Sequence, residues 1–118
     1  EAYQRSGIGP KDVDVVQLHD CFASAEIIRL EACGFCPKGE GGRWVEEGRT
    51  DIGGEIPVNT DGGLLSRGHP IGATGLAQIA EIVWQLRGEA GRRQVPNARV
   101  GMCQNTGLGG ANVHILKV

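Results

Sequence analysis

The pattern of hydrophobic and polar positions predicts a strand followed by a helix near the start of the chain. Residues 13–18 (VDVVQL) are rich in β-branched side chains and follow a Gly-Pro turn, which indicates a buried strand. Between residues 23 and 33 apolar positions recur every three or four residues, which predicts an amphipathic helix that ends at Gly34. A strand, a polar elbow and a helix in this order form half of a βαβ unit. Residues 2–7 have the pattern of the last turn of another helix.

The strongest helical pattern covers residues 76–87, and Gly88 is placed to end that helix. Its apolar positions form one stripe that we expect to face the core: Leu76, Ile79, Ala80 and Val83, widened by Ile82 and Leu86. Residues 37–57, which precede it, carry six glycines and alternating charges. We expect this segment to be a long loop or a short hairpin flap.

Two strands are predicted at residues 98–102 and 111–118, on either side of the glycine-rich residues 103–110. A glycine-rich turn between paired strands predicts an antiparallel hairpin. The order of elements is then β-α-loop-α-β-β. This order indicates an α/β fold with a mixed sheet covered by helices and a final β-hairpin.

Composition narrows the class of protein. Glycine supplies 20 of 118 residues, or about 17%, against a usual share of roughly 7%. The absence of a Gly-X-Y period excludes a collagen-like chain, and the plentiful aliphatic residues exclude a disordered one. The glycines therefore belong to a globular fold in which the backbone comes close to another group. A chain of this length encloses one domain or part of one, and no apolar run is long enough to span a membrane.

Charge and cysteine content exclude further classes. The 12 basic and 14 acidic residues give a net charge of −2, which argues against broad binding to nucleic acid or anionic lipid. Four cysteines are too few and too unevenly spaced for a secreted disulfide scaffold. Cys33 and Cys36 form a CxxC at a predicted helix end, where we interpret them as small apolar residues rather than a redox pair. No second pair exists for zinc, so no metal site is predicted.

Three clusters of reactive side chains lie at junctions between the predicted elements. They are His19-Asp20-Cys21, Ser66-Arg67-Gly68-His69 and Cys103-Gln104-Asn105. Open α/β sheets bind ligands at the carboxyl ends of their strands, so three such junctions predict one site.

The first cluster lies where the predicted strand turns into a helix. The positive end of the helix dipole would favour a thiolate at Cys21, although a small buried residue is also common at this position. His19 is placed either to bind a substrate oxygen or to cap the helix. Asp20 is a candidate N-cap residue.

The second cluster ends in Gly-His-Pro. Pro70 forces His69 toward an extended backbone, and the neighbouring glycines let a ligand approach closely. A structural or surface histidine is the alternative. The glycines of residues 72–75 offer a phosphate cradle at a helix N-terminus, but the Walker spacing and its lysine are missing.

These motifs resemble a known family. The run VNTDGGLLSRGHPIGATGLAQIAEIVWQLRGEAGRRQVPNARV, followed by NTGLGGANV, is similar to the carboxyl-terminal half of thiolases. The HDCF of residues 19–22 resembles the sterol carrier protein X branch, in which HDCF stands where other thiolases carry NEAF. The resemblance covers essentially the whole chain. It implies that residues 1–118 are one partial thiolase-like C-terminal domain, from an enzyme with two similar halves of five strands each.

The resemblance also implies an activity. Thiolases are acyl-CoA acyltransferases that cleave 3-oxoacyl-CoA, or form it by Claisen condensation, and yield acetyl- or propionyl-CoA and a shortened acyl-CoA in fatty acid β-oxidation or sterol side-chain metabolism. Coenzyme A is then a substrate, and no bound cofactor is expected. The nucleophilic cysteine belongs to the missing N-terminal half or a partner subunit, so this chain alone is expected to be inactive. A homodimer or tetramer, cytoplasmic in bacteria or peroxisomal in eukaryotes, is expected.

The resemblance assigns roles to residues. His69 matches the histidine that activates the nucleophile and helps to form an oxyanion hole. His19 matches the position that binds the water or carbonyl oxygen of that hole, and Cys21 matches the acid/base cysteine of this branch. Most thiolases take that cysteine from a CxG motif, which here is Cys103-Gln104-Asn105, so Cys103 is the second candidate. Four further residues are expected to bind substrate: Gly68, Asn105, Gly107 and Gly109.

Two alternatives remain open. One is a thiolase-fold aldolase that cleaves a sterol side-chain CoA ester, although Cys21 beside His69 favours acyl transfer. The other is a non-catalytic thiolase-like subunit that binds acyl-CoA or lipid for a partner.

Overall fold

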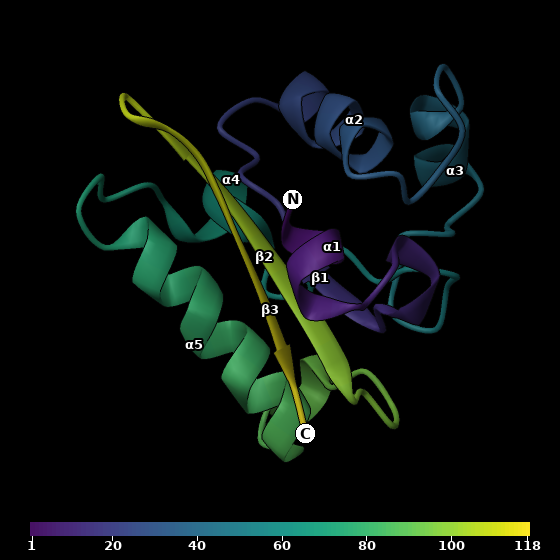
Figure 1. Ribbon diagram of the computed structural model, residues 1–118, viewed down its shortest axis with the longest axis vertical. Coiled ribbons are helices and arrows are strands. Elements are labelled where there is room, and N and C mark those ends of the chain that lie inside the picture. Colours follow the sequence, from purple (N-terminus) through teal and green to yellow (C-terminus); the bar gives the residue numbers. More distant parts are fainter.

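A three-stranded mixed sheet organises the chain, and the computed structural model describes all 118 residues. The strand order is β1-β2-β3 (Figure 1). Strand β1 (Val15–Gln17) runs parallel to β2 (Val100–Gly107), which pairs antiparallel with β3 (Gly110–Lys117). At the other edge of β1, Val16 forms an isolated parallel bridge with Val58. The mixed sheet and the final hairpin confirm the predicted fold class, with three strands and one bridge where the resemblance implies five strands.

Helices cover both faces of this sheet (Figure 1). Helix α5 (Thr74–Arg87) lies along one face, and the other face carries α1 (Ala2–Ser6) and α2 (Ala23–Ala32), with α3 (Gly41–Glu46) packed on α2. The remaining helical segments are short: α4 (Gly63–Arg67), η1 (Pro10–Asp12) and η2 (Gly91–Arg93). None of the helices combines the length and hydrophobicity that crossing a membrane requires.

Strand β1 is buried on both of its faces, as in sheets that carry helices on either side. Val16 belongs to the larger core cluster, together with Leu30 of α2 and Trp44 of α3. Val15 belongs to a smaller cluster that contains Ile82 of α5. The strand is shorter than the predicted range of residues 13–18, because side chains take over the backbone hydrogen bonding on either side of it. The carboxylate of Asp14 accepts the Val100 N–H at 2.8 Å, and the Asn59 side chain accepts the Leu18 N–H at 2.8 Å.

The predicted helix at residues 23–33 is confirmed, and it ends at Gly34, whose φ is +80°. Cys33 is the C-cap residue of this helix, and Cys36 lies in the core. The CxxC therefore occupies a helix end, as predicted. Both thiols are free, and burial raises the pKa of each. No cluster of three or more His, Cys, Asp or Glu side chains is arranged to hold a metal ion.

The prediction of a loop or hairpin flap at residues 37–57 is wrong, because this segment contains α3. Trp44 of α3 is only 8% exposed and packs into the larger core cluster. Gly41, at the start of α3, donates its N–H to Glu31 Oε1 of α2 at 3.0 Å. A Cβ on Gly41 would lie 3.0 Å from Ile27 Cγ2, so the two helices approach closely only at a glycine. Tertiary packing forms this helix.

The predicted apolar stripe of α5 is confirmed in part: Ile82 is buried, and Ile79 and Leu86 pack against the smaller core cluster, but Leu76 does not. The buried side of this helix is mainly polar and consists of Thr74, Gln78, Glu81, Ile82 and Gln85. Leu76, which we expected in the core, is 71% exposed. The buried polar groups have partners outside the helix. Both Glu81 oxygens share the Arg93 Nε–H, Glu81 Oε2 also accepts from Arg93 Nη2, and Gln78 Nε2 donates to the Gln104 carbonyl. Satisfied polar groups can be buried at low cost, so the polar side faces the sheet.

The final hairpin is longer, and its turn shorter, than the sequence predicts. The β2–β3 ladder continues to the pair Gly107 and Gly110, which leaves only Leu108 and Gly109 in the turn. Residues 103–105 therefore lie inside β2 and not at a junction between elements, because the pairing with β3 extends past them.

Candidate active site

Two histidines from separate segments meet at the end of β1. The ring centroids of His19 and His69 lie 4.9 Å apart, with an interplanar angle of 87°. His19 lies two residues beyond the end of β1, and His69 lies in the segment between α4 and α5. The first two clusters predicted from the sequence thus share one site, as expected for junctions beside the carboxyl end of a strand.

His19 is 4% exposed, and its ring is only partly satisfied. Its backbone N–H donates to Gln104 Oε1 at 3.4 Å, whereas its ring Nδ1 is buried without a hydrogen-bond partner. Burial lowers the pKa of His19, and the positive charge of Arg29 and the His69 ring lower it further, against the opposing effect of Asp20. The ring is therefore held neutral.

His69 is exposed and is anchored on one side only. Its Nδ1 lies 2.7 Å from Thr74 Oγ1, the hydroxyl of the first residue of α5. Gly68, immediately before it, has a φ of +90° and forms the C-cap of α4. The chain turns sharply at this glycine, and its open surroundings leave space beside the imidazole.

Asp20 connects the segments that carry the two histidines. Its carboxylate is 1% exposed and accepts the backbone N–H groups of Leu64 at 2.8 Å and Leu65 at 3.4 Å, at the start of α4. The prediction that Asp20 caps α2 is wrong: Phe22 is the N-cap residue of α2, and no side chain caps that helix. His19 likewise caps no helix. The close fit requires Gly63, because a Cβ there would overlap Asp20 Oδ2. The Gly-Gly pair at residues 62–63 was the available sequence signal.

Asp61 is a second carboxylate that holds α4 in place. Its carboxylate accepts hydrogen bonds from Gln17 Nε2 at 3.0 Å, from the Gly63 N–H at 3.0 Å and from Arg67 Nε at 2.8 Å. Burial alone would raise the pKa of Asp61, but these hydrogen bonds and the positive charge of Arg67 together lower it. Asp61 therefore stays ionised and ties α4 to β1.

The two candidate acid/base cysteines have different surroundings. Cys21 is half-buried at the elbow beside His19, so the alternative of a fully buried residue is not what the structure has. Cys103 is 2% exposed and belongs to the core cluster beneath α5. Burial raises the pKa of the Cys103 thiol to about 11, and the hydrogen bond from the His114 backbone offsets this only in part.

Cys103 and Asn105 line a cavity of about 290 Å³ between the start of α5 and the β2–β3 hairpin. Ile71 and Gly72, which follow His69, form part of its wall together with His114, but His19 and His69 do not. Asn105 Nδ2 donates to Gln78 Oε1 at 3.0 Å, so the residue that replaces the glycine of CxG is fixed against α5. Gly107 and Gly109 are exposed at the tip of the hairpin and lie outside this cavity.

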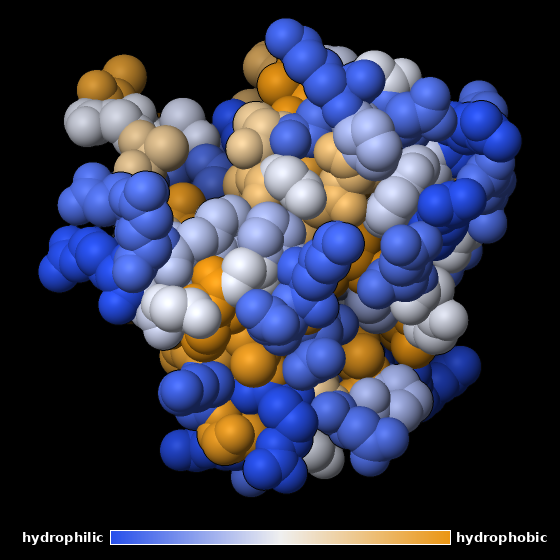
Figure 2. All heavy atoms as spheres, turned by 45° about the vertical axis from the view of Figure 1, so that its right-hand side comes forward, coloured by the Kyte–Doolittle hydropathy of each residue, from blue (hydrophilic) through white to orange (hydrophobic).

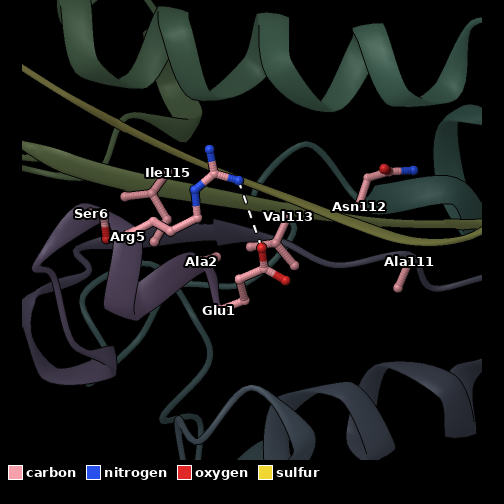
Figure 3. A pocket seen from close by; sticks show the side chains of 8 residues that line it. All are labelled: Glu1, Ala2, Arg5, Ser6, Ala111, Asn112, Val113 and Ile115. Atoms are coloured by element: carbon pink, nitrogen blue, oxygen red, sulfur yellow. Dashed lines mark ion pairs between the residues drawn. The ribbon is translucent and has the colours of Figure 1, made fainter.

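A larger groove of about 630 Å³ lies elsewhere, between α1 and the outer side of β3 (Figure 3). Glu1 and Arg5 form an ion pair over it at 3.7 Å, and both are highly exposed. None of the residues predicted to act in catalysis or substrate binding lines this groove.

Apolar side chains reach the surface between charged ones (Figure 2). Several of the most exposed are sequence neighbours of the candidate site: Phe22 follows Cys21, and Leu65 and Ile71 lie on either side of His69.

Comparison with known proteins identifies the family. Residues 1–117 match the family model described as thiolase C-terminal domain-like. The chain is 58% identical to sterol carrier protein 2 of Rattus norvegicus over 113 residues, which are 96% of this chain and 21% of that protein. It is 57% identical to an acetyl-CoA acetyltransferase of Methanothermobacter thermautotrophicus over 116 residues, 97% of this chain and 30% of that protein.

A solved structure, described as an Ltp2-ChsH2(DUF35) aldolase, superposes with a TM-score of 0.86 at 30% identity. The match covers 98% of this chain and 30% of that one. The chain thus spans between about a fifth and a third of the proteins it matches. Because the family model and the relatives cover nearly every residue, the chain belongs to the thiolase family, as a thiolase C-terminal domain.

Proposed function

We propose that this chain forms one wall of an acyl-CoA acyltransferase site that cleaves 3-oxoacyl-CoA with coenzyme A. The observation that supports this best is the edge-to-face contact of His19 and His69 at the end of β1. One imidazole is buried, neutral and missing a partner at Nδ1, and the other is exposed and anchored at a single nitrogen. A binder of a carbonyl oxygen and a general base need these two different environments.

The proposed roles divide between the three side chains. His69 accepts the proton of a nucleophilic thiol from the other half of the enzyme, and that thiolate attacks the 3-keto carbon. The carbonyl oxygen gains negative charge and is held at the His19 and His69 rings. When the C2–C3 bond breaks, its electron pair forms the enolate of acetyl-CoA, and the Cys21 thiol protonates that carbon. A second coenzyme A thiol gives its proton to the Cys21 thiolate and attacks the acyl group, and His69 returns its proton to the departing nucleophilic thiolate, which restores all three side chains.

Cys21 is proposed as the acid/base, ahead of Cys103. Cys21 is half-buried on the elbow next to His19, whereas Cys103 is almost completely buried. A thiol with a pKa near 11 returns to its protonated form readily but gives up its proton poorly at neutral pH. Cys103 and Asn105 are instead proposed to shape the cavity beside the His69 segment, with Gly68, Gly107 and Gly109 as positions of close approach for the substrate.

An aldolase is the second candidate, because the superposed structure is described as one. Thiolysis consumes a free coenzyme A thiol, whereas aldol cleavage does not. Dependence of product formation on coenzyme A therefore separates the two reactions.

The test uses the full-length parent protein with acetoacetyl-CoA and with a longer 3-oxoacyl-CoA, each with and without coenzyme A. We expect coenzyme A-dependent cleavage, and a loss of roughly 10²- to 10⁴-fold in kcat for His69→Ala and Cys21→Ala. Cys103→Ala should retain most of the activity, and Cys33→Ala serves as a control for removal of a half-buried thiol.

Two outcomes would count against this function. Absence of product with both substrates would favour an aldolase or a non-catalytic subunit. Full turnover of Cys21→Ala together with inactivity of Cys103→Ala would exchange the roles of the two cysteines.

A further inference from the structure

The hydroxyl of Thr74 makes two contacts that together limit how His69 can hold its proton. Thr74 Oγ1 lies 2.7 Å from His69 Nδ1 and 3.0 Å from the carbonyl oxygen of Pro70. A hydroxyl has one proton to donate, and a carbonyl oxygen can only accept. The contact with Pro70 therefore takes the hydroxyl proton, and the Thr74 oxygen is left to accept a hydrogen bond from His69.

We propose that Thr74 is a positioning residue that fixes the tautomer of His69, with the proton on Nδ1 and the lone pair on Nε2. Nδ1–H donates to Thr74 Oγ1, and the same hydroxyl donates to the Pro70 carbonyl. The ring is then held in one orientation, and Nε2 is the nitrogen that faces away from this chain of hydrogen bonds.

The position of Thr74 in the helix makes this arrangement rigid. Thr74 is the first residue of α5 and is 1% exposed, so its side chain has little room to rotate. A threonine hydroxyl in a helix readily bonds the carbonyl four residues earlier, and its β-branch restricts χ1. The Thr74 N–H also donates to the Pro70 carbonyl, at 2.9 Å. The backbone and the side chain of Thr74 thus both donate to the Pro70 carbonyl oxygen.

The two histidines of the site differ in this respect. His19 has no partner at Nδ1, and its backbone rather than its ring is bonded to Gln104. Only His69 has a ring nitrogen bonded to a buried hydroxyl that is itself bonded to a main-chain carbonyl. A fixed tautomer is what a general base requires, because only an unprotonated nitrogen can accept a proton.

The consequence for catalysis rests on the proposed function. With Nε2 free, His69 accepts the proton of the attacking thiol without first exchanging its own proton. Removal of the Thr74 hydroxyl lets the ring populate both tautomers and turn, so fewer molecules are competent at any moment. We expect Thr74→Val, which keeps the shape of the side chain, to lower kcat roughly tenfold with little change in KM. Thr74→Ser, which keeps the hydroxyl, should restore most of the loss.

The tautomer itself is measured without any assay of activity. In the full-length parent protein labelled with ¹⁵N-histidine, His69 is assigned with His69→Gln, at a mildly alkaline pH where imidazole is neutral. We expect a pyrrole-type shift for Nδ1 and a pyridine-type shift for Nε2 in the parent and in Thr74→Ser, and averaged shifts in Thr74→Val. Thr50→Val, at another buried threonine between α3 and the Val58 bridge, is the matched control and should change neither shift nor kcat.

The outcomes separate this inference from the proposed function. A proton on Nε2 in the parent overturns the inference whatever the activity, and so do shifts and kcat that Thr74→Val leaves unchanged. If Thr74→Val does not fold, the shifts of the parent alone decide. A parent protein with the expected shifts but without coenzyme A-dependent cleavage would refute the proposed function and leave the tautomer assignment standing.

Discussion

The imidazole rings of His19 and His69 meet edge to face at 4.9 Å, although they belong to segments on opposite sides of α2, α3 and α4 in the chain. No hydrogen bond joins the two rings directly. Their relative position is set by Asp20, which follows His19 and binds the start of the helix that leads to His69. The geometry of the site therefore depends on a buried carboxylate that makes no hydrogen bond to either imidazole ring.

Removal of the Asp20 carboxylate should disturb this arrangement. Asp20→Ala leaves the N–H groups of Leu64 and Leu65 without an acceptor, which should lower the free energy of unfolding by about 1–3 kcal/mol. Asp20→Asn keeps one oxygen for Leu64 and should cost less. Urea unfolding measures both, with the exposed Asp51→Ala as the control. Equal stability of Asp20→Ala and the parent would contradict the anchor.

His19 should make stability depend on pH. Because its pKa is lowered in the folded state, the unfolded state binds the proton more readily, so protonation favours unfolding. The contribution of the neutral ring is complete above about pH 6.5, the ordinary value for histidine, and is lost as the pH falls below it. On acidification the Tm of the parent should therefore fall more than the Tm of His19→Gln. A difference that stays constant with pH would contradict this.

Tyr3 should ionise late. Its hydroxyl donates to the Cys33 carbonyl at 2.7 Å, and burial, together with the nearby Cys33, raises its pKa to about 12. A raised pKa in the folded state gives stability that is full below about pH 10, the ordinary tyrosine value, and is lost as the pH rises toward 12. The ultraviolet difference spectrum between the parent and Tyr3→Phe, recorded on raising the pH, measures the titration. Ionisation near the ordinary value would show that the hydroxyl is solvated.

The cysteines should react at different rates. Cys21 is half-buried and Cys103 is 2% exposed with a pKa raised to about 11, so iodoacetamide should modify Cys21 first at neutral pH. Mass spectrometry of peptides after short exposures measures the order. Modification of Cys103 as fast as Cys21 in the folded protein would remove the structural reason to prefer Cys21.

Gly101 allows α5 to lie close to the sheet. A Cβ at this position would be 2.5 Å from Ile82 Cγ2, so Gly101→Ala should lower the free energy of unfolding by about 1–3 kcal/mol through overpacking. Gly107→Ala, in the same strand but with no atom within 4 Å of the added Cβ, is the matched control. In an Ile82→Ala background, Gly101→Ala should lower the free energy of unfolding by less. An unchanged loss would show that contact with Ile82 is not its cause.

Local sequence signals predicted the elements that local signals control. The helix ending at Gly34, the helix ending at Gly88 and the antiparallel hairpin all depend on turn residues and periodicity, and all are present. Helix α3 was missed because it begins with two glycines, which weaken any helical pattern, and because the burial of Trp44 forms it. The position of the hairpin turn was missed because all of the glycine-rich residues 103–110 were assigned to the turn, whereas most of them pair in the β2–β3 ladder.

The sequence predicts the reactive side chains of the candidate site but not the contacts that hold them in place. His19, Cys21 and His69 follow from motifs, whereas the roles of Asp20 and Thr74 depend on contacts between segments distant in sequence or on side-chain geometry. An aspartate before a helix usually caps that helix, and here it binds a different one. Only the folded structure reveals which N–H groups its carboxylate reaches.

The inward-facing polar side of α5 reverses the usual guide to mutational tolerance. On most helices polar positions accept replacement and apolar ones resist it. Here Gln85 donates to Thr60, Glu81 and the Arg93 carbonyl while its own oxygen accepts the Val95 N–H, so a leucine in its place would strand several groups. Leu76, by contrast, is 71% exposed, so a polar replacement there should cost the fold of this chain little. A stability screen of α5 should therefore find intolerant positions at the buried glutamines as well as at Ile82, and a permissive position at Leu76.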